Sequence, residues 1–201
     1  MQILTALRQA ERQPHREDVA TARASTVEPK RCLASAAPAC VAQFMAELAQ
    51  VGGQCIAVAD RSALMPTIEG LVTNGQSLLS LCHEVAGNRQ FQSAPEALHD
   101  IDWAVCHAQL GIAESGAILL DDRQCGQRVL PIIAEQLIVV LEQRQIVATM
   151  SQAVEFWLQA NPELDWGWGS FLVGPSSSHA IDDQWIRGAQ GGCSLTVLLL
   201  P

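Results

Sequence analysis

The sequence predicts an α/β domain in which a mostly parallel sheet lies between two layers of helices. Of its 201 residues, 49% are hydrophobic and only 16% are charged, as expected when secondary-structure elements are covered on both faces. The short uninterrupted apolar runs LIVVL at 137–141 and LTVLLL at 195–200 are typical of strands buried on both faces. Apolar runs alternate with helical patterns, which favours parallel βαβ units and therefore a three-layer α/β/α fold.

The first elements are defined by helical spacing and its interruptions. Residues 1–37 are expected to form a short helix and a flexible arm, because the apolar spacing in ILTALRQA ends at Pro14. The α/β domain is expected to span 38–201. Its first helix has an apolar face between residues 41 and 48 and ends at the glycine pair 52–53, where a left-handed residue is favoured.

The remaining elements follow from the same two patterns. The predicted strands are 55–59, 77–82, 103–106, 116–120, 137–141, 170–173 and 195–200. The further predicted helices are 61–72, 127–134, 151–159 and 179–188. The apolar runs are too brief for buried helices, so we interpret them as strands.

The charge distribution argues against a nucleic-acid partner. The formal net charge is −9, and six of the twelve basic residues fall within the first 31 positions. Residues 32–201 therefore carry six basic and seventeen acidic side chains. Binding to a phosphate backbone needs clustered Lys and Arg, which this acidic domain lacks.

Cysteine spacing and hydropathy predict a cytoplasmic protein without a metal or cofactor of its own. The seven cysteines form no CxxC pair, and several lie in apolar runs, where a free thiol behaves as a small hydrophobic group. The N-terminus lacks the apolar core of a signal peptide, and no apolar run reaches the roughly 18 residues of a membrane helix. We therefore expect no membrane association.

The first candidate site is GIAESG at 111–116, just before a predicted strand. Gly111 and Gly116 allow a sharp turn and a close approach to a ligand, which makes Glu114 and Ser115 candidates for substrate contact. Glu114 is the candidate catalytic residue, because a carboxylate in a closed pocket can act as an acid, a base or a nucleophile. The alternative, a tight turn with a solvated Glu, has equal weight.

The second candidate begins at Gly174, where an apolar strand leads into GPSSS and a predicted helix. Backbone N–H groups at a helix N-terminus, together with the hydroxyls of Ser176, Ser177 and Ser178, form a site for a small anion. In the alternative interpretation the serines only cap the helix, and the carboxylates at 182–183 repel an anion. No GK[ST] follows, which excludes a P-loop.

The third candidate is the glycine-rich run before the last strand, which includes Gly188, Gln190 and Gly191. Such a turn can approach a ligand at the carboxyl ends of neighbouring strands. A plain helix ending is the favoured alternative. His107 and His179 flank the first two candidate segments, and we weigh them as a catalytic pair.

The order of these segments resembles the LUD-domain family, that of the LutC and YkgG lactate-utilisation proteins. The resemblance rests on ILTALRQA, GIAESG at 111–116, Arg128, Leu130–Pro131, Val139–Val140, Ile146–Val147, the GPS turn and the final apolar strand. It implies the fold of ribose-phosphate isomerase and CoA-transferase-like proteins.

The chain departs from this family pattern near the GPS turn. Ser177 replaces an Arg, Ala180 an Asp, Asp182 a Glu and Gln190 a His, and no His stands between Pro131 and Val140. Loss of the Arg removes a permanently charged bidentate donor. An anion site here would therefore be weaker or would have to recruit Arg187.

By resemblance, the leading functional hypothesis is a component of L-lactate utilisation. It would act with separate iron–sulfur and redox subunits in oxidising lactate to pyruvate, without holding a cluster itself. The second hypothesis is a small-molecule enzyme or binder of the same fold, which takes an anionic metabolite such as a CoA ester, folate or sugar phosphate. The third is a non-catalytic scaffold.

Overall fold

The computed structural model describes residues 38–90, 100–126, 128, 130–161, 168–179, 185–187 and 192–201. All of them belong to one compact unit, Arg31–Pro201. The predicted arm at 1–37 and the candidate positions Gly188, Gln190 and Gly191 lie outside the described residues. Among the helices that are described, none is long and apolar enough to cross a membrane.

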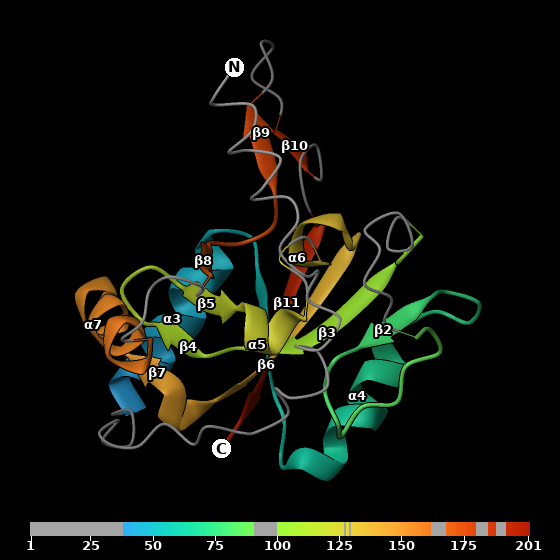
Figure 1. The fold of residues 1–201 in the computed structure, drawn as a ribbon, viewed down its shortest axis with the longest axis horizontal. Helices are drawn as coiled ribbons and strands as arrows, with labels where there is room; N and C mark the ends of the chain where they lie inside the picture. The colour runs from blue at the N-terminus through green and yellow to red at the C-terminus, as the bar shows by residue number, and fades with distance from the viewer. Residues whose placement is uncertain are drawn as a thin grey trace, which may run out of the picture. The chain divides into compact units, whose positions relative to one another are not determined.

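The central sheet has five strands, all parallel, in the order β1-β11-β6-β3-β2 (Figure 1). Their bounds are β1 Gln54–Ala57, β11 Ser194–Leu200, β6 Gln136–Glu142, β3 Trp103–His107 and β2 Leu78–Ser80. The two longest, β6 and β11, are the predicted runs LIVVL and LTVLLL, and they pair along their whole length. The predicted fold class, a mostly parallel sheet flanked by helices, is confirmed.

Helices cover both faces of this sheet, because successive side chains of a strand point to opposite sides. Val139 of β6 belongs to a core cluster with Phe44 and Leu48 of α3 (Pro38–Gln50). The adjacent Ile138 belongs to a second cluster, with Leu64 and Ile68 of α4 (Leu64–Leu71). The short 3-10 helix η1 (Arg61–Ala63) directly precedes α4. Together, η1 and α4 account for the helix predicted at 61–72.

A second sheet occupies part of the layer next to α3, and the sequence did not predict it. Its order is β7-β4-β5-β8, with bounds Ile146–Val147, Leu110–Ile112, Ala117–Asp121 and Gly169–Leu172. The strands predicted at 116–120 and 170–173 exist, but they pair antiparallel with each other. Strands β4 and β5 also pair antiparallel, because the four residues between them are too few for a parallel crossover.

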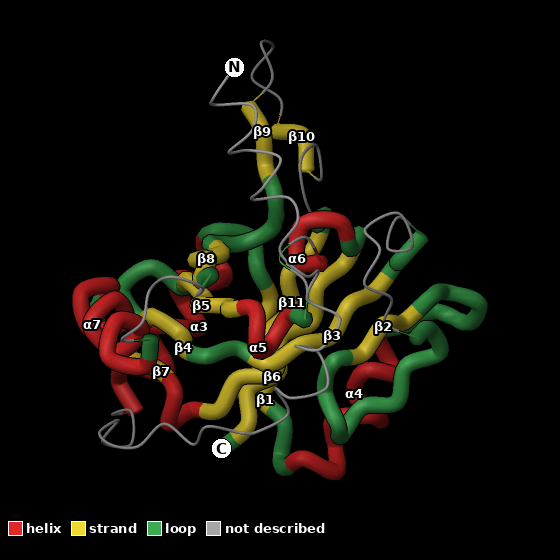
Figure 2. Tube along the Cα trace, in the orientation of Figure 1, coloured by secondary structure: helices red, strands yellow, loops and turns green. Residues whose placement is uncertain are grey.

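Helix α7 (Met150–Ala160) covers the outer face of the second sheet. It corresponds to the helix predicted at 151–159. Its buried Ala153 shares a cluster with Leu119 of β5 and Ile112 of β4. Thr149 caps the helix by accepting a hydrogen bond from the Gln152 N–H at 3.4 Å. Figure 2 separates these helices and strands by colour.

The helix predicted at 179–188 is wrong. The first residue of that range ends β9 (Ser177–His179), and β10 (Trp185–Arg187) lies within it, antiparallel to β9. The serines and aspartates gave local signals for a helix start, but Trp185 and Ile186 favour strands, and cross-strand pairing outweighs local preference. The range 127–134 contains the short α6 (Leu130–Ile133), and α5 (Asp122–Cys125) comes before it.

Candidate functional site

The glycines of GIAESG lie where neighbouring elements approach the β4–β5 turn closely. Gly116 has φ +64°, and a Cβ there would stand 2.3 Å from the backbone N of Leu48 in α3. A Cβ on Gly111 would stand 2.8 Å from Leu141 Cδ2 in β6. Packing against α3 and β6 therefore explains both glycines without a ligand.

The side chain of Glu114 joins the same turn to helix α7. Its Oε1 accepts a hydrogen bond from the backbone N–H of Met150, the first residue of the helix, at 2.6 Å. The Glu114 N–H donates to the carbonyl of Ala148 at 3.1 Å. Glu114 is exposed, and the Ser115 hydroxyl accepts from the Ala117 N–H at 3.4 Å. These contacts are those of a helix cap and a turn.

The GPSSS segment lies beside the start of β11. Gly174 has φ +71°, and the Ser176 N–H donates to the carbonyl of Gly192 at 2.9 Å. The next residue along, Cys193, donates its N–H to the Glu135 carbonyl just before β6 at 2.6 Å. The turn after β8 is therefore tied to the amino ends of β11 and β6 (Figure 1).

A pocket of about 330 Å³ opens at this edge, and we call it the amino-edge pocket. The GPSSS turn contributes Gly174, Pro175, Ser176 and Ser177, and the segment before β11 contributes Gly192. Apolar side chains form the rest of its wall, together with Ser194: Pro131, Ile132, Leu137, Phe171, Leu172, Val173 and Leu195. Glu114 and Ser115 do not line it.

Two predictions about placement are only partly covered by the described residues. Gly192 directly precedes β11 and so lies at the amino edge of the central sheet, whereas the rest of the predicted glycine run lies outside the described residues. His107 ends β3 at the carboxyl edge, and His179 ends β9, which belongs to a separate two-stranded sheet. The pairing of the two histidines stays a prediction.

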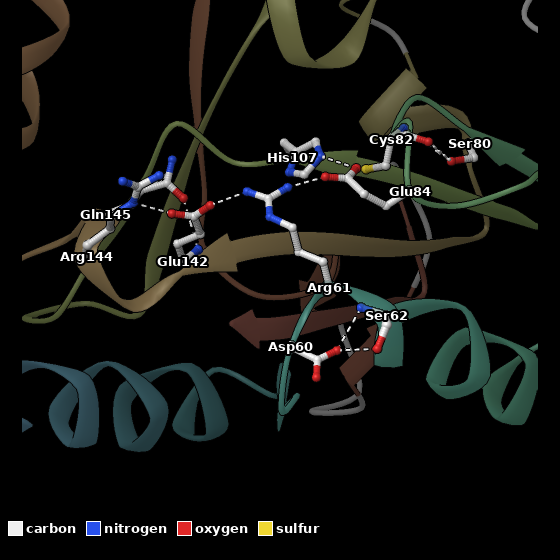
Figure 3. A network of polar contacts seen from close by, with 10 residues as sticks. All are labelled: Asp60, Arg61, Ser62, Ser80, Cys82, Glu84, His107, Glu142, Arg144 and Gln145. Carbon is white, nitrogen blue, oxygen red and sulfur yellow. Dashed lines mark hydrogen bonds and ion pairs between the residues drawn. The ribbon is translucent and has the colours of Figure 1, made fainter. Parts of the chain in front are cut away.

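The carboxyl edge of the sheet carries a polar network that sequence reasoning missed (Figure 3). Arg61, which follows β1, contacts both Glu84 and Glu142. His107 Nε2 lies 3.3 Å from Glu84 Oε2, and Arg144 contacts Glu142. Asp60 accepts hydrogen bonds from the Ser62 N–H at 2.8 Å and the Ala63 N–H at 3.2 Å, which caps η1.

The network ties together segments that follow four parallel strands. Partial burial opposes ionisation of Glu84, but hydrogen bonding, His107 and Arg61 outweigh it, and the pKa of Glu84 lies below its ordinary value. Arg61 is 52% exposed, so each ion pair contributes little by itself. Arg61, Glu84, His107 and Glu142 follow the apolar runs CIAVA, SLLSLC, WAVC and LIVVL. A polar residue just after a predicted parallel strand is expected at the carboxyl edge of the sheet, and this is the sequence feature that could have predicted the network.

A second hollow of about 450 Å³ lies along the outer face of α7. Met150, Val154 and Leu158 line it at helical spacing, and Val154 and Leu158 are 39% and 45% exposed.

No group of three His, Cys, Asp or Glu side chains is placed to hold a metal ion within the described part of the chain.

Comparisons with known proteins identify the family. No functionally curated protein matches the chain. A crystal structure of a DUF162-family protein from Deinococcus radiodurans, solved at 1.70 Å, matches with a TM-score of 0.60 and 19% sequence identity. The match covers 81% of this chain and 97% of that one, and at this identity it shows a shared fold.

The family model of the LUD domain matches residues 90–200, which is more than half of the chain. The matched region contains the β4–β5 turn with GIAESG, the GPSSS turn and the amino-edge pocket. It begins after β2, so the first two strands of the central sheet lie outside the match. On this match, the chain belongs to the LUD-domain family.

Proposed function

We propose that this protein is a component of an L-lactate utilisation system and acts with separate iron–sulfur and redox subunits in oxidising lactate to pyruvate. The observation that carries the proposal is the LUD-domain match at 90–200, over a region that contains both GIAESG and the GPSSS turn. In the resemblance set out above, this family works in lactate utilisation.

The cysteine spacing agrees with a division of labour between this chain and its partners. Iron–sulfur clusters are held by sets of cysteine thiolates, often closely spaced along the chain. The seven cysteines of this chain form no CxxC pair. The proposal therefore assigns the two-electron chemistry to the partner subunits and ligand binding to this chain.

The amino-edge pocket is the part of the chain that we assign to ligand binding. Its volume of about 330 Å³, its apolar wall and its few hydroxyls are typical of small-molecule sites. In this proposal Glu114 serves as the cap that orients α7 and the hairpin, which agrees with its hydrogen bond to Met150.

A deletion strain of the source organism tests the proposal. We expect the strain to lose growth on L-lactate as the carbon source and to keep growth on pyruvate, the product of the oxidation. Tagged protein purified without oxygen should bring down partners whose visible absorption marks iron–sulfur clusters. Normal growth on L-lactate, together with no such partner, would overturn the proposal.

The same pocket favours a second candidate function, a small-molecule enzyme of this fold that acts outside lactate metabolism. A thermal-shift screen of CoA esters, folates and sugar phosphates tests it, because a ligand that binds only the native state raises the melting temperature. A shift that Glu114→Gln abolishes would place the ligand at Glu114 and not in the amino-edge pocket. A shift that survives Glu114→Gln places the ligand elsewhere.

A further inference from the structure

The described lining of the amino-edge pocket carries no charged side chain. Of the thirteen described residues that line it, ten are apolar residues, prolines or glycines, and the three others are Ser176, Ser177 and Ser194. The neighbouring sequence 180–191 adds one basic residue, Arg187, and two acidic ones, Asp182 and Asp183. Neither the described wall nor this segment supplies a net positive charge.

The wall of the pocket is apolar and partly open to water. Ile132 of α6 is 50% exposed and Val173, after β8, is 49% exposed. Both line the pocket beside Phe171 and Leu172. Covering them with an apolar ligand surface would remove this area from water, which is favourable.

The polar side of the pocket offers neutral hydrogen bonds. The Ser194 hydroxyl donates to Gln136 Oε1 at 3.3 Å, and Ser177 is exposed at the start of β9. A hydroxyl can donate to a carbonyl or accept from an amide or another hydroxyl. It cannot supply the charge that a desolvated carboxylate or phosphate needs, and burying an unpaired charge is costly.

From these observations we infer that the amino-edge pocket binds an uncharged, partly apolar molecule that carries a carbonyl, amide or hydroxyl group. Ser177, where the family pattern has Arg, is the specificity-determining residue and sets the preference for an uncharged head group. The inference rests on the proposed function only in taking this pocket as the ligand site. It replaces the small anion that the GPSSS turn suggested.

A pair of matched probes tests the inference on the purified full chain. 2-Naphthamide and 2-naphthoate have the same fused rings. The first carries an uncharged amide group, and the second carries a carboxylate at the same position. Titrations followed by ligand-observed NMR should show tighter binding of the amide to the wild-type protein. The variant Ser177→Arg should reverse the order and bind the carboxylate at least about tenfold more tightly than the wild type, because a guanidinium pairs with a carboxylate through two charged hydrogen bonds.

Two further variants locate the binding. Ile132→Asp, at a half-exposed position of the wall, should abolish binding of the amide without a large change in melting temperature. Arg187→Gln should leave the amide affinity unchanged. Wild-type protein that binds the carboxylate as tightly as the amide, or that binds neither, would overturn the inference.

The outcomes separate this inference from the proposed function. Normal growth of the deletion strain on L-lactate would refute the metabolic role and leave the probe preference standing. A preference for the carboxylate in the wild type, lost in Arg187→Gln, would refute the uncharged ligand and leave the lactate proposal standing.

Discussion

Replacing Gly116 by Ala tests the conclusion that the GIAESG glycines are needed for packing. At φ +64° an L-residue is strained, and the added Cβ would stand 2.3 Å from the Leu48 backbone N in α3. We expect strain of about 1–2 kcal/mol and overpacking of about 1–3 kcal/mol, offset by about 0.4–1 kcal/mol from the stiffer unfolded chain. The free energy of unfolding should therefore fall by about 1–5 kcal/mol.

Two control substitutions separate strain from overpacking. Gly75 has φ +94° with nothing within 4 Å of an added Cβ, so Gly75→Ala should show strain alone. Gly70 lies in α4 with open space around it, and Gly70→Ala should stabilise the protein by about 0.5–1 kcal/mol.

Urea unfolding followed by tryptophan fluorescence measures all three variants. For a chain of this size, each kcal/mol lowers the melting temperature by about 2–4 °C, which gives an independent check. A loss of stability in Gly116→Ala no larger than that in Gly75→Ala would refute the claim that α3 packs against the turn at this position.

Three further predictions follow from the contacts described above. Glu114→Ala should lower the free energy of unfolding by about 1 kcal/mol, because α7 loses a cap, and Glu114→Gln, which keeps an acceptor oxygen, should lower it less; urea titrations compare the two, and equal losses would contradict the capping role. The folded-state pKa of Glu84 is depressed, so its ionised form contributes stability above the unfolded pKa, and this stability is lost as pH falls through the folded value. The melting temperatures of wild type and Glu84→Gln should therefore differ at neutral pH and converge in acid, and a constant difference would argue against the ion pairs. Cys55 and Cys82, whose thiols stay protonated, should resist iodoacetamide at pH 8 in the native protein and react on unfolding; mass spectrometry of the labelled cysteines decides.

The central sheet could be predicted from the sequence because its signals are local. The runs LIVVL and LTVLLL are short and almost entirely apolar, which is typical of strands buried on both faces, and they form most of β6 and β11. Helix α7 was predicted from its own periodicity, and Thr149 and Gln152 form a capping box at its start. The family resemblance rests on short motifs and on their order along the chain. Recognising such motifs requires no knowledge of tertiary contacts.

The features that escaped prediction depend on residues distant in sequence. Arg61 meets Glu84 and Glu142 across 23 and 81 positions, and only the strand order brings them to one edge. The GIAESG turn was recognised, but the reasons for its glycines lie in Leu48 and Leu141. The segment after GPSSS had local helix signals, yet Ser177 pairs with Arg187 in a strand ladder.

Complementation of the deletion strain on L-lactate is the measurement that tests the central claim most directly. The claim is that this LUD-domain chain serves lactate oxidation and needs its amino-edge pocket for it, with an uncharged molecule rather than the lactate carboxylate as the ligand of that pocket. Wild type and Glu114→Gln should restore growth, since the carboxylate acts as a helix cap. Ile132→Asp, checked for a normal melting temperature, should fail on L-lactate and grow on pyruvate. Growth of Ile132→Asp on L-lactate, or failure of a stably folded Glu114→Gln, would contradict the account.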